Sequence, residues 1–352
     1  GNLLYTYYHV LTTRVLDRHC FASKKATKNL IKKIEEISPD LIQLHNLHGY
    51  YLNIELLFNF LKSVNIPVVW SLHDAWALTG HCTQFEHIKC MKWKEVCHKC
   101  PQSNEYPASY FSDNSRKNHL QKKELFTSVK NLHLITSSAW SADLIAQSFL
   151  SDFDITIIPN GVDQEIFKPR QNSEFRINHN IEGKFVVLGV SNVWNSQKGY
   201  HDFIKLSSLL DKDTTLVMVG LTEIQLKNLP NNIIGVQRTA NTKELAELYS
   251  MSDVYVNLTY ADTFPTTNLE ALSCGTPIIT YNTGGSVESV NEHTGYIVEQ
   301  GEINKVLEKI NLIKKSGKNK YQPKCLTYAR ENYNMIEQYL KYINLYKPLM
   351  EI

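Results

Sequence analysis

The stretch from Tyr260 to Val287 most strongly constrains the fold, because it combines apolar runs, a helix pattern and sharp turn signals in a fixed order. The apolar run at 253–258 predicts a buried strand. A polar loop follows, and Pro265 with the two threonines after it predicts the start of a helix. Gly275 and Pro277 end that helix, and the apolar run at 277–281 predicts a second buried strand. The order predicts a strand–loop–helix–strand unit of a parallel sheet.

Two acidic residues, eight positions apart, stand out in this unit. Asp262 lies in the loop, and Glu270 lies about two turns into the helix. Ligands bind at the carboxyl ends of parallel strands, and the amino end of a helix favours an anion such as a diphosphate. We interpret both acids as candidate ligand contacts, with Glu270 able to accept hydrogen bonds from a ribose diol. The alternative is that Asp262 caps the helix and Glu270 is a solvated helix residue.

Strand and helix patterns alternate along the whole chain, which predicts an α/β protein. Its 352 residues are enough for two domains with separate cores. A polar region from about Pro169 to Gly183 predicts the hinge between them. We expect an N-terminal acceptor-side domain at 1–168, a nucleotide-binding domain at 184–330 and a C-terminal helix at 331–352.

Composition excludes several function classes. The net charge of +2 is too small for a dedicated nucleic-acid binder. The sequence has no apolar run of about 18 residues that would span a membrane, and no secretory signal pattern. The seven cysteines form no obvious secreted disulfide framework, so we expect a cytoplasmic protein in a reducing environment.

Residues 81–100 carry four cysteines in one loop: Cys82, Cys90, Cys97 and Cys100. The last two have the two-residue spacing of a metal knuckle, and four thiolates complete a tetrahedral structural zinc site. Such a closed site leaves no open position for chemistry. The alternative is a set of reduced cysteines, or one redox-labile disulfide.

The segment at 106–129 mixes aromatic and basic residues. One interpretation is a solvated helix face beside a core stripe, with Lys122 among its basic residues. The other is a peripheral patch that rests on the anionic inner face of the plasma membrane and admits a lipid-linked acceptor.

The motif from Asp262 to Glu270, followed by Gly-Thr-Pro and Gly-Gly, resembles the acidic-x7-acidic signature of retaining family-four glycosyltransferases. Most members carry Glu at the first position. A subgroup that builds bacterial capsule and colanic-acid-type exopolysaccharides carries Asp there, followed by a stretch like Phe264-Pro265-Thr266. The resemblance implies the GT-B fold, with two doubly wound Rossmann-like domains facing a cleft. Relatives also have a first strand and a Gly-rich loop, so we expect this chain to lack the start of its first domain.

The resemblance also implies an activity: a hexose moves from a UDP- or GDP-hexose to a glycan or polyprenyl-linked acceptor. The anomeric configuration is retained, and no cofactor takes part in the chemistry. His73 and Asp262 are the implied catalytic residues; His45 and His48 are weaker candidates on the acceptor side. Lys198 matches a family lysine on the donor diphosphate, whereas the usual arginine position is filled by Asn192 or Trp194. The implied donor contacts are Lys198, Arg238, Thr263, Phe264, Pro265, Thr266, Thr267 and Glu270.

Two other classes stay open. One is a GT-B sugar-nucleotide epimerase or phosphorylase, although neither shares the motif around Asp262 well. The other is a zinc-bearing, non-catalytic interaction protein built on the same scaffold.

Overall fold

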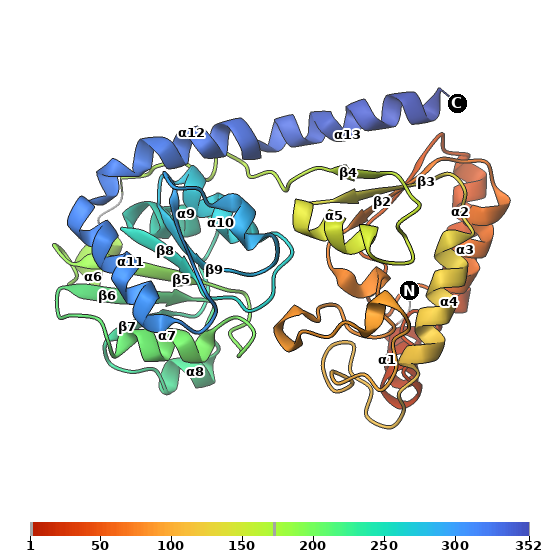
Figure 1. The fold of residues 1–352 in the computed structure, drawn as a ribbon, viewed down its shortest axis with the longest axis horizontal. Coiled ribbons are helices and arrows are strands. Elements are labelled where there is room, and N and C mark those ends of the chain that lie inside the picture. The colour runs from red at the N-terminus through yellow and green to blue at the C-terminus, as the bar shows by residue number, and fades with distance from the viewer. Residues whose placement is uncertain (1–2, 172–173, 352) are drawn as a thin grey trace. The chain divides into compact units, whose positions relative to one another are not determined.

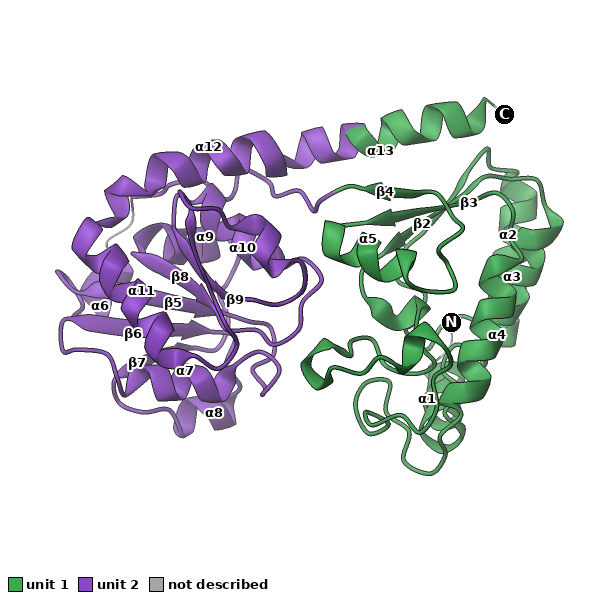
Figure 2. Cartoon of the chain, viewed as in Figure 1, with its two compact units in different colours: residues 1–158, 341–352 green, residues 159–340 purple. Residues whose placement is uncertain are grey.

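The computed structural model describes residues 3–171 and 174–351, and the chain divides into two compact units (Figure 2). Unit 1 comprises residues 1–158 and 341–352, and unit 2 comprises residues 159–340. The boundary at 158 and 159 lies earlier than the predicted domain end at 168. The predicted hinge at 169–183 includes residues 172 and 173, which lie outside the described residues.

Unit 1 is built on a parallel sheet in which neighbouring strands follow one another along the chain (Figure 1). Its strands, in both sequence and spatial order, are β1 (Ile42–Leu44), β2 (Val68–Leu72), β3 (Leu132–Thr136) and β4 (Ile155–Ile157). Every residue of β2 is buried, as expected for a continuous apolar run in a covered parallel sheet. Its helices are α1 (Leu3–Leu16), α2 (Lys24–Ile37), α3 (Ile54–Ser63), α4 (Ser115–Thr127) and α5 (Ala139–Ala146).

Side-chain caps fix where two of these helices begin. The Asn53 side chain accepts a hydrogen bond from Leu56 N at 2.9 Å at the start of α3, and the Ser138 side chain accepts one from Ser141 N at 3.2 Å at the start of α5. Between β2 and α4 the chain forms an irregular loop with three short 3₁₀ turns: η1 (Ala75–Ala77), η2 (Glu86–Ile88) and η3 (Lys92–Lys94).

Unit 2 contains a six-stranded parallel sheet in the order β10-β9-β8-β5-β6-β7. Its strands are β5 (Phe185–Val190), β6 (Thr214–Val219), β7 (Ile233–Val236), β8 (Val254–Asn257), β9 (Ile278–Tyr281) and β10 (Gly295–Val298). The chain moves outward from β5 to β7 and then returns to place β8 on the other side of β5. This reversal is the topological switch point at which open α/β sheets bind ligands.

Helices cover this sheet, with α9 and α10 on one side and α7 on the other (Figure 1). The helices of unit 2 are α6 (Glu174–Asn178), α7 (Tyr200–Ser207), α8 (Glu223–Lys227), α9 (Thr242–Met251), α10 (Thr266–Ser273), α11 (Ile303–Ser316) and α12 (Gln322–Tyr333). The two parallel sheets confirm the predicted α/β class.

The last helix, α13 (Met335–Met350), contributes to both units, because its residues from Lys341 onward belong to unit 1. There Tyr342, Leu345 and Tyr346 pack against a small apolar cluster on the sheet of unit 1. Within the described ranges, none of the helices combines the length and the apolar character needed to cross a bilayer.

Candidate functional site

An ion pair lies at the switch point of unit 2. Lys198 follows β5 and Asp262 follows β8, and the lysine Nζ lies 2.7 Å from Asp262 Oδ2. The two side chains are only 33% and 18% exposed, respectively. The strand reversal therefore joins two loops that are 64 residues apart in sequence and brings a cation and a carboxylate to the ligand-binding edge of the sheet.

Close backbone packing holds Lys198 in this position. Gly199 has a φ of +72°, and a Cβ atom there would lie 2.2 Å from the carbonyl oxygen of Leu258. Beside this contact, Tyr260 N donates a hydrogen bond to Gln197 O at 2.8 Å. Only glycine suits both the left-handed backbone and the close approach, so the loop after β5 rests directly on the loop after β8.

The loop with Asp262 leads into α10, where Pro265 occupies the N-cap position and makes no side-chain cap hydrogen bond. The alternative in which Asp262 caps this helix is therefore wrong, since its carboxylate pairs with Lys198. The Gly-Gly turn supports the same loop, because Gly285 N donates to Asp262 O at 3.2 Å. Inside α10, Asn268 is fully buried and donates to Ser289 Oγ at 2.8 Å. These contacts orient the amino end of α10 beside the ion pair.

Glu270 points toward α9 rather than into solvent. Its Oε2 accepts a hydrogen bond from the hydroxyl of Tyr249 at 2.9 Å, and Tyr249 is fully buried. Desolvation by burial raises the pKa of Glu270, although the Tyr249 hydrogen bond opposes that shift. The interpretation of Glu270 as a solvated helix residue is therefore wrong. The apolar spacing of α9 indicates that Tyr249 faces inward, but no sequence signal shows that its hydroxyl reaches Glu270.

Two aromatic residues expected near the donor are part of the core. The Phe264 side chain is 4% exposed, with its ring 5.8 Å from that of Tyr333. The Phe264 side chain therefore packs in the core of unit 2, and its predicted donor contact stays a prediction. Trp194 is also buried, and its Nε1 donates to Val219 O at 2.8 Å. Trp194 therefore does not fill the position of the missing arginine. Asn192 is exposed.

Arg238 lies on a separate groove of unit 2, about 800 Å³ in volume, at the carboxyl ends of β5, β6 and β7. Within the part of the chain that the structure describes, it makes no hydrogen bond or ion pair with Lys198, Asp262 or Glu270. The groove is lined by Val190, Ser191, Asn192, Val219, Gly220, Gln237, Arg238, Thr239, Ala240, Asn241, Thr242 and Leu245. Of the remaining donor candidates, Pro265 is buried, Thr263 and Thr267 are half-buried, and Thr266 is exposed.

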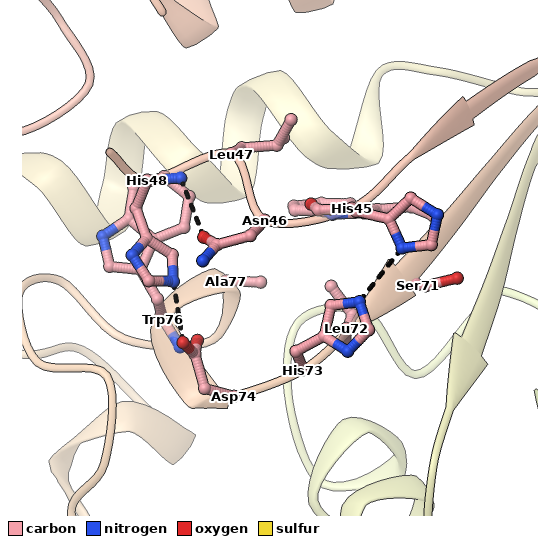
Figure 3. Close-up of a pocket in the computed structure, with 11 residues that line it drawn as sticks. His45, Asn46, Leu47, His48, Ser71, Leu72, His73, Asp74, Trp76 and Ala77 are labelled. Carbon is pink, nitrogen blue, oxygen red and sulfur yellow. Dashed lines mark hydrogen bonds and ion pairs between the residues drawn. The ribbon is translucent and has the colours of Figure 1, made fainter. Parts of the chain in front are cut away.

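In unit 1, His73 follows β2 and meets His45, which follows β1 (Figure 3). His45 Nδ1 lies 3.0 Å from His73 Nε2, and the two rings stack at a centroid distance of 5.3 Å. One nitrogen must donate and the other accept, so the contact requires at least one neutral ring. Desolvation by burial lowers the pKa of both histidines, and at His73 the neighbouring His45 adds to the shift.

A second polar pair lines the same pocket of unit 1 (Figure 3). His48 Nε2 lies 2.7 Å from Asp74 Oδ2, and the other carboxylate oxygen of Asp74 accepts a hydrogen bond from Trp76 N at 2.8 Å. The Asp74 carboxylate thus has two roles: one oxygen caps η1, and the other orients His48. The structure brings all the histidines that sequence analysis named as site candidates to one edge of the sheet.

Lys122, predicted to lie on a solvated helix face or a membrane patch, is buried. Its Nζ donates to Trp76 O at 2.7 Å and to Thr79 O at 3.0 Å, and lies 3.4 Å from the centroid of the Trp76 ring. Desolvation by burial lowers its pKa to about 7. That prediction is wrong for Lys122, whereas Tyr110 and Phe111 of the same segment are exposed. The four cysteines of the 81–100 loop line one cavity nearby in unit 1.

Residues 171–332 match the family model of glycosyl transferases group 1. The chain is 24% identical over 278 residues to the colanic acid biosynthesis glycosyl transferase WcaC of Escherichia coli K12, covering 75% of this chain and 65% of that protein. It is also 24% identical over 181 residues to the capsular polysaccharide biosynthesis glycosyltransferase CapM of Staphylococcus aureus, covering 47% of this chain and 48% of that protein. The chain thus spans less than two thirds of the length of these relatives.

Solved structures share the fold of this chain. Sucrose-phosphate synthase of Thermosynechococcus elongatus superposes with a TM-score of 0.69 at 16% identity, over 92% of this chain and 77% of that one. The Anabaena protein Alr3699/HepE, solved in complex with UDP-glucose, gives a TM-score of 0.66 at 18% identity, over 91% and 81%. At such identities the likeness concerns the fold. Residues 171–332 form a group 1 glycosyltransferase domain, and the chain that carries it has the GT-B fold.

Proposed function

We propose that the protein transfers a hexose from a nucleotide-diphosphate sugar to a glycan or lipid-linked acceptor in bacterial surface polysaccharide synthesis, with retention at the anomeric carbon. The observation that carries this proposal is the Lys198–Asp262 pair, 2.7 Å apart, beside the amino end of α10. A cation and free helix amides together suit a diphosphate, and a carboxylate suits sugar hydroxyls.

The chemical demand of such a transfer is to neutralise the diphosphate as it leaves. Lys198 and the backbone N–H groups of Thr266 and Thr267 supply positive potential that is already in place, which is the most effective form of electrostatic stabilisation. This chemistry needs no divalent ion. Asp262 supports the positive charge that develops on the sugar, and Glu270, held by Tyr249, accepts hydrogen bonds from the ribose. Arg238 and the groove of about 800 Å³ around it are assigned to the nucleotide.

The likeness to WcaC and CapM supports an acceptor of the exopolysaccharide or capsule type, and the UDP-glucose complex of the Anabaena protein supports a UDP-hexose, with GDP-hexose as the second choice. We assign His73 to substrate contact in unit 1. The exposed aromatic residues Tyr106, Tyr110 and Phe111 support a peripheral contact with the inner face of the plasma membrane, where a polyprenyl-linked acceptor resides.

The test is nucleotide release by the full-length protein from a panel of UDP- and GDP-hexoses, with lipid-linked acceptors present and NMR of the product at the anomeric carbon. We expect release with one donor and an unchanged anomeric configuration. Lys198→Met should reduce release about 10²-fold or more, because one charged stabiliser of the leaving group is lost. Lys205→Met is the matched control, because Lys205 is exposed on α7.

Other outcomes contradict the proposal in distinguishable ways. An epimerised nucleotide or a sugar phosphate as product would favour the epimerase or phosphorylase class. An inverted anomeric carbon would refute retention. Failure of every donor to raise the melting temperature would favour a non-catalytic interaction protein.

A further inference from the structure

The 81–100 loop has little regular structure of its own, yet it gathers its four cysteines around one cavity. Between η1 and α4 the only regular elements of this described stretch are the short turns η2 and η3. Cys82, Cys90, Cys97 and Cys100 line the cavity, which has a volume of about 10 Å³. That volume suits a single water-sized body. All four cysteines are free of disulfides.

These cysteines differ from the other three of the chain. Cys20, Cys274 and Cys325 are buried within the apolar core, which is the usual place of an inert cysteine. Cys90, Cys97 and Cys100 are only half-buried, although they surround the same cavity. Packing alone therefore does not explain why thiols gather here. Thiolates are soft ligands that select zinc, and four of them close a tetrahedral structural site.

The turn between Cys97 and Cys100 brings both cysteines to the same cavity. Lys99 adopts a left-handed conformation, with φ of +44°, immediately before Cys100. The Nζ of Lys92 donates hydrogen bonds to the carbonyl oxygens of His98 and Lys99, both at 3.0 Å. The turn is thus folded back with both cysteines on the same cavity. We propose that Cys82, Cys90, Cys97 and Cys100 bind one structural zinc ion.

The geometry also sets the movement that binding requires. Zinc–sulfur bonds of about 2.3 Å place the sulfurs of a tetrahedral site roughly 3.8 Å apart. Over residues 3–171 and 174–351, three ligand atoms lie within 4.8 Å of one another only at His9, His19 and Cys20. No three of the four loop sulfurs lie within that distance of one another, so the sulfurs must move closer together on binding. No strand pairing of the loop opposes that movement.

The His9 cluster is not the metal site, although its atoms are closer together. His9 Nε2 accepts a hydrogen bond from Cys20 N at 2.9 Å, and its Nδ1 lies 2.8 Å from Ser23 Oγ. Both ring nitrogens are therefore engaged within the protein, and neither offers a lone pair to an ion.

The ion has a structural consequence for the His45–His73 pocket. Ala75 N donates to Thr83 O at 2.9 Å, and the Thr79 hydroxyl donates to Cys82 O. These bonds tie the segment after Asp74 to the cysteine loop. The segment at 74–82 begins at Asp74, which caps η1 and holds His48. Zinc bound at Cys82 therefore fixes the other end of this segment. Zinc acts here by positioning, and the inference does not depend on the proposed function.

The test is metal analysis by mass spectrometry of the full-length protein purified under reducing conditions without chelator. We expect one zinc ion per chain. Cys97→Ser and Cys100→Ser should reduce the zinc content to trace levels. Cys325→Ser makes the same chemical change outside the loop and should retain the ion. Zinc retained in the two loop variants would overturn the assignment.

A second measurement covers the case in which the loop variants fail to fold. Cobalt titrated into the wild-type protein should give the intense visible bands of a tetrahedral thiolate site, and zinc should displace it. Absence of zinc and of these bands overturns the proposal. A mass loss of two hydrogens that dithiothreitol restores also overturns the proposal, because two cysteines would then be joined in a disulfide and could not bind the ion.

Discussion

Acid should weaken unit 1 through His9, a residue of α1 whose side chain is fully buried. The neutral ring accepts a hydrogen bond from Cys20 N at 2.9 Å and thereby docks α1 onto the following segment. Protonation of Nε2 would place two donors against each other. His19 and Tyr50 pack on the same ring and offer no negative charge to compensate. Desolvation by burial lowers the pKa of His9 from 6.5 to about 4.

The size of the effect follows from that difference in pKa. Because the unfolded state takes up the proton first, the stability is fully present above pH 6.5 and is lost as the pH falls toward 4. At pH 5 an unfolded histidine favours the protonated form about 30-fold, whereas the folded one is mostly neutral, so unfolding gains about 2 kcal/mol. This is a large part of the 5–15 kcal/mol that stabilises a typical domain.

Urea unfolding at pH 7 and pH 5, followed by tryptophan fluorescence, measures this loss. Four of the five tryptophans lie in unit 1, so the signal reports mainly on that unit. His9→Gln keeps an acceptor for Cys20 N but cannot take up a proton. We expect the variant to lose about 2 kcal/mol less than the wild type between the two pH values. His201→Gln, at an exposed position in unit 2, is the control. Parallel losses in wild type and His9→Gln would refute the reasoning.

Three further predictions concern the site. Asp262→Asn should lower kcat about 10²-fold with little change in donor affinity, because its proposed role lies in the transition state; equal losses in isothermal titration and turnover would contradict this. Gly199→Ala should reduce nucleotide release and stability more than Gly183→Ala does. Both glycines have positive φ, but only at Gly199 would a Cβ lie within 4 Å of other atoms, so equal melting temperatures of the two variants would contradict this. The pH–rate profile should fall on the acid side only below 6.5, because desolvation lowers the pKa of His73 and His45; an inflection above 6.5 would exclude the neutral pair as the working form.

Local pattern was sufficient to predict the unit around the switch point. The strand predicted at 253–258 is β8 (Val254–Asn257), and the strand predicted at 277–281 is β9 (Ile278–Tyr281). Short apolar runs predict such strands from the local sequence, and Gly275 and Pro277 mark the start of β9 because turn residues restrict the backbone directly. In α2 (Lys24–Ile37), apolar residues likewise recur at helical spacing.

Contacts between elements that are distant in sequence could not be predicted from local sequence patterns. The family resemblance implied that Lys198 contacts a diphosphate. Its contact with Asp262 could not be predicted, because the strand order that creates it depends on how all six strands pair. Local sequence patterns predict that a lysine is exposed to solvent. Lys122 is nevertheless buried, because two loop carbonyls and the Trp76 ring surround its ammonium. Such environments arise only from the assembled fold.

The Lys198–Asp262 pair also explains how a strongly polar site can be stable when no ligand is bound. A partly buried lysine ammonium loses some of its hydration, which is costly if it has no partner. Asp262 supplies that partner at 2.7 Å, and close packing at Gly199 prevents the loop from swinging away. In the proposed transfer, Lys198 would exchange the Asp262 carboxylate for the diphosphate, and the released carboxylate would then be available to the sugar, where positive charge develops. One short ion pair thus prepares both charges that the proposed transfer needs, and breaking it from either side should impair turnover.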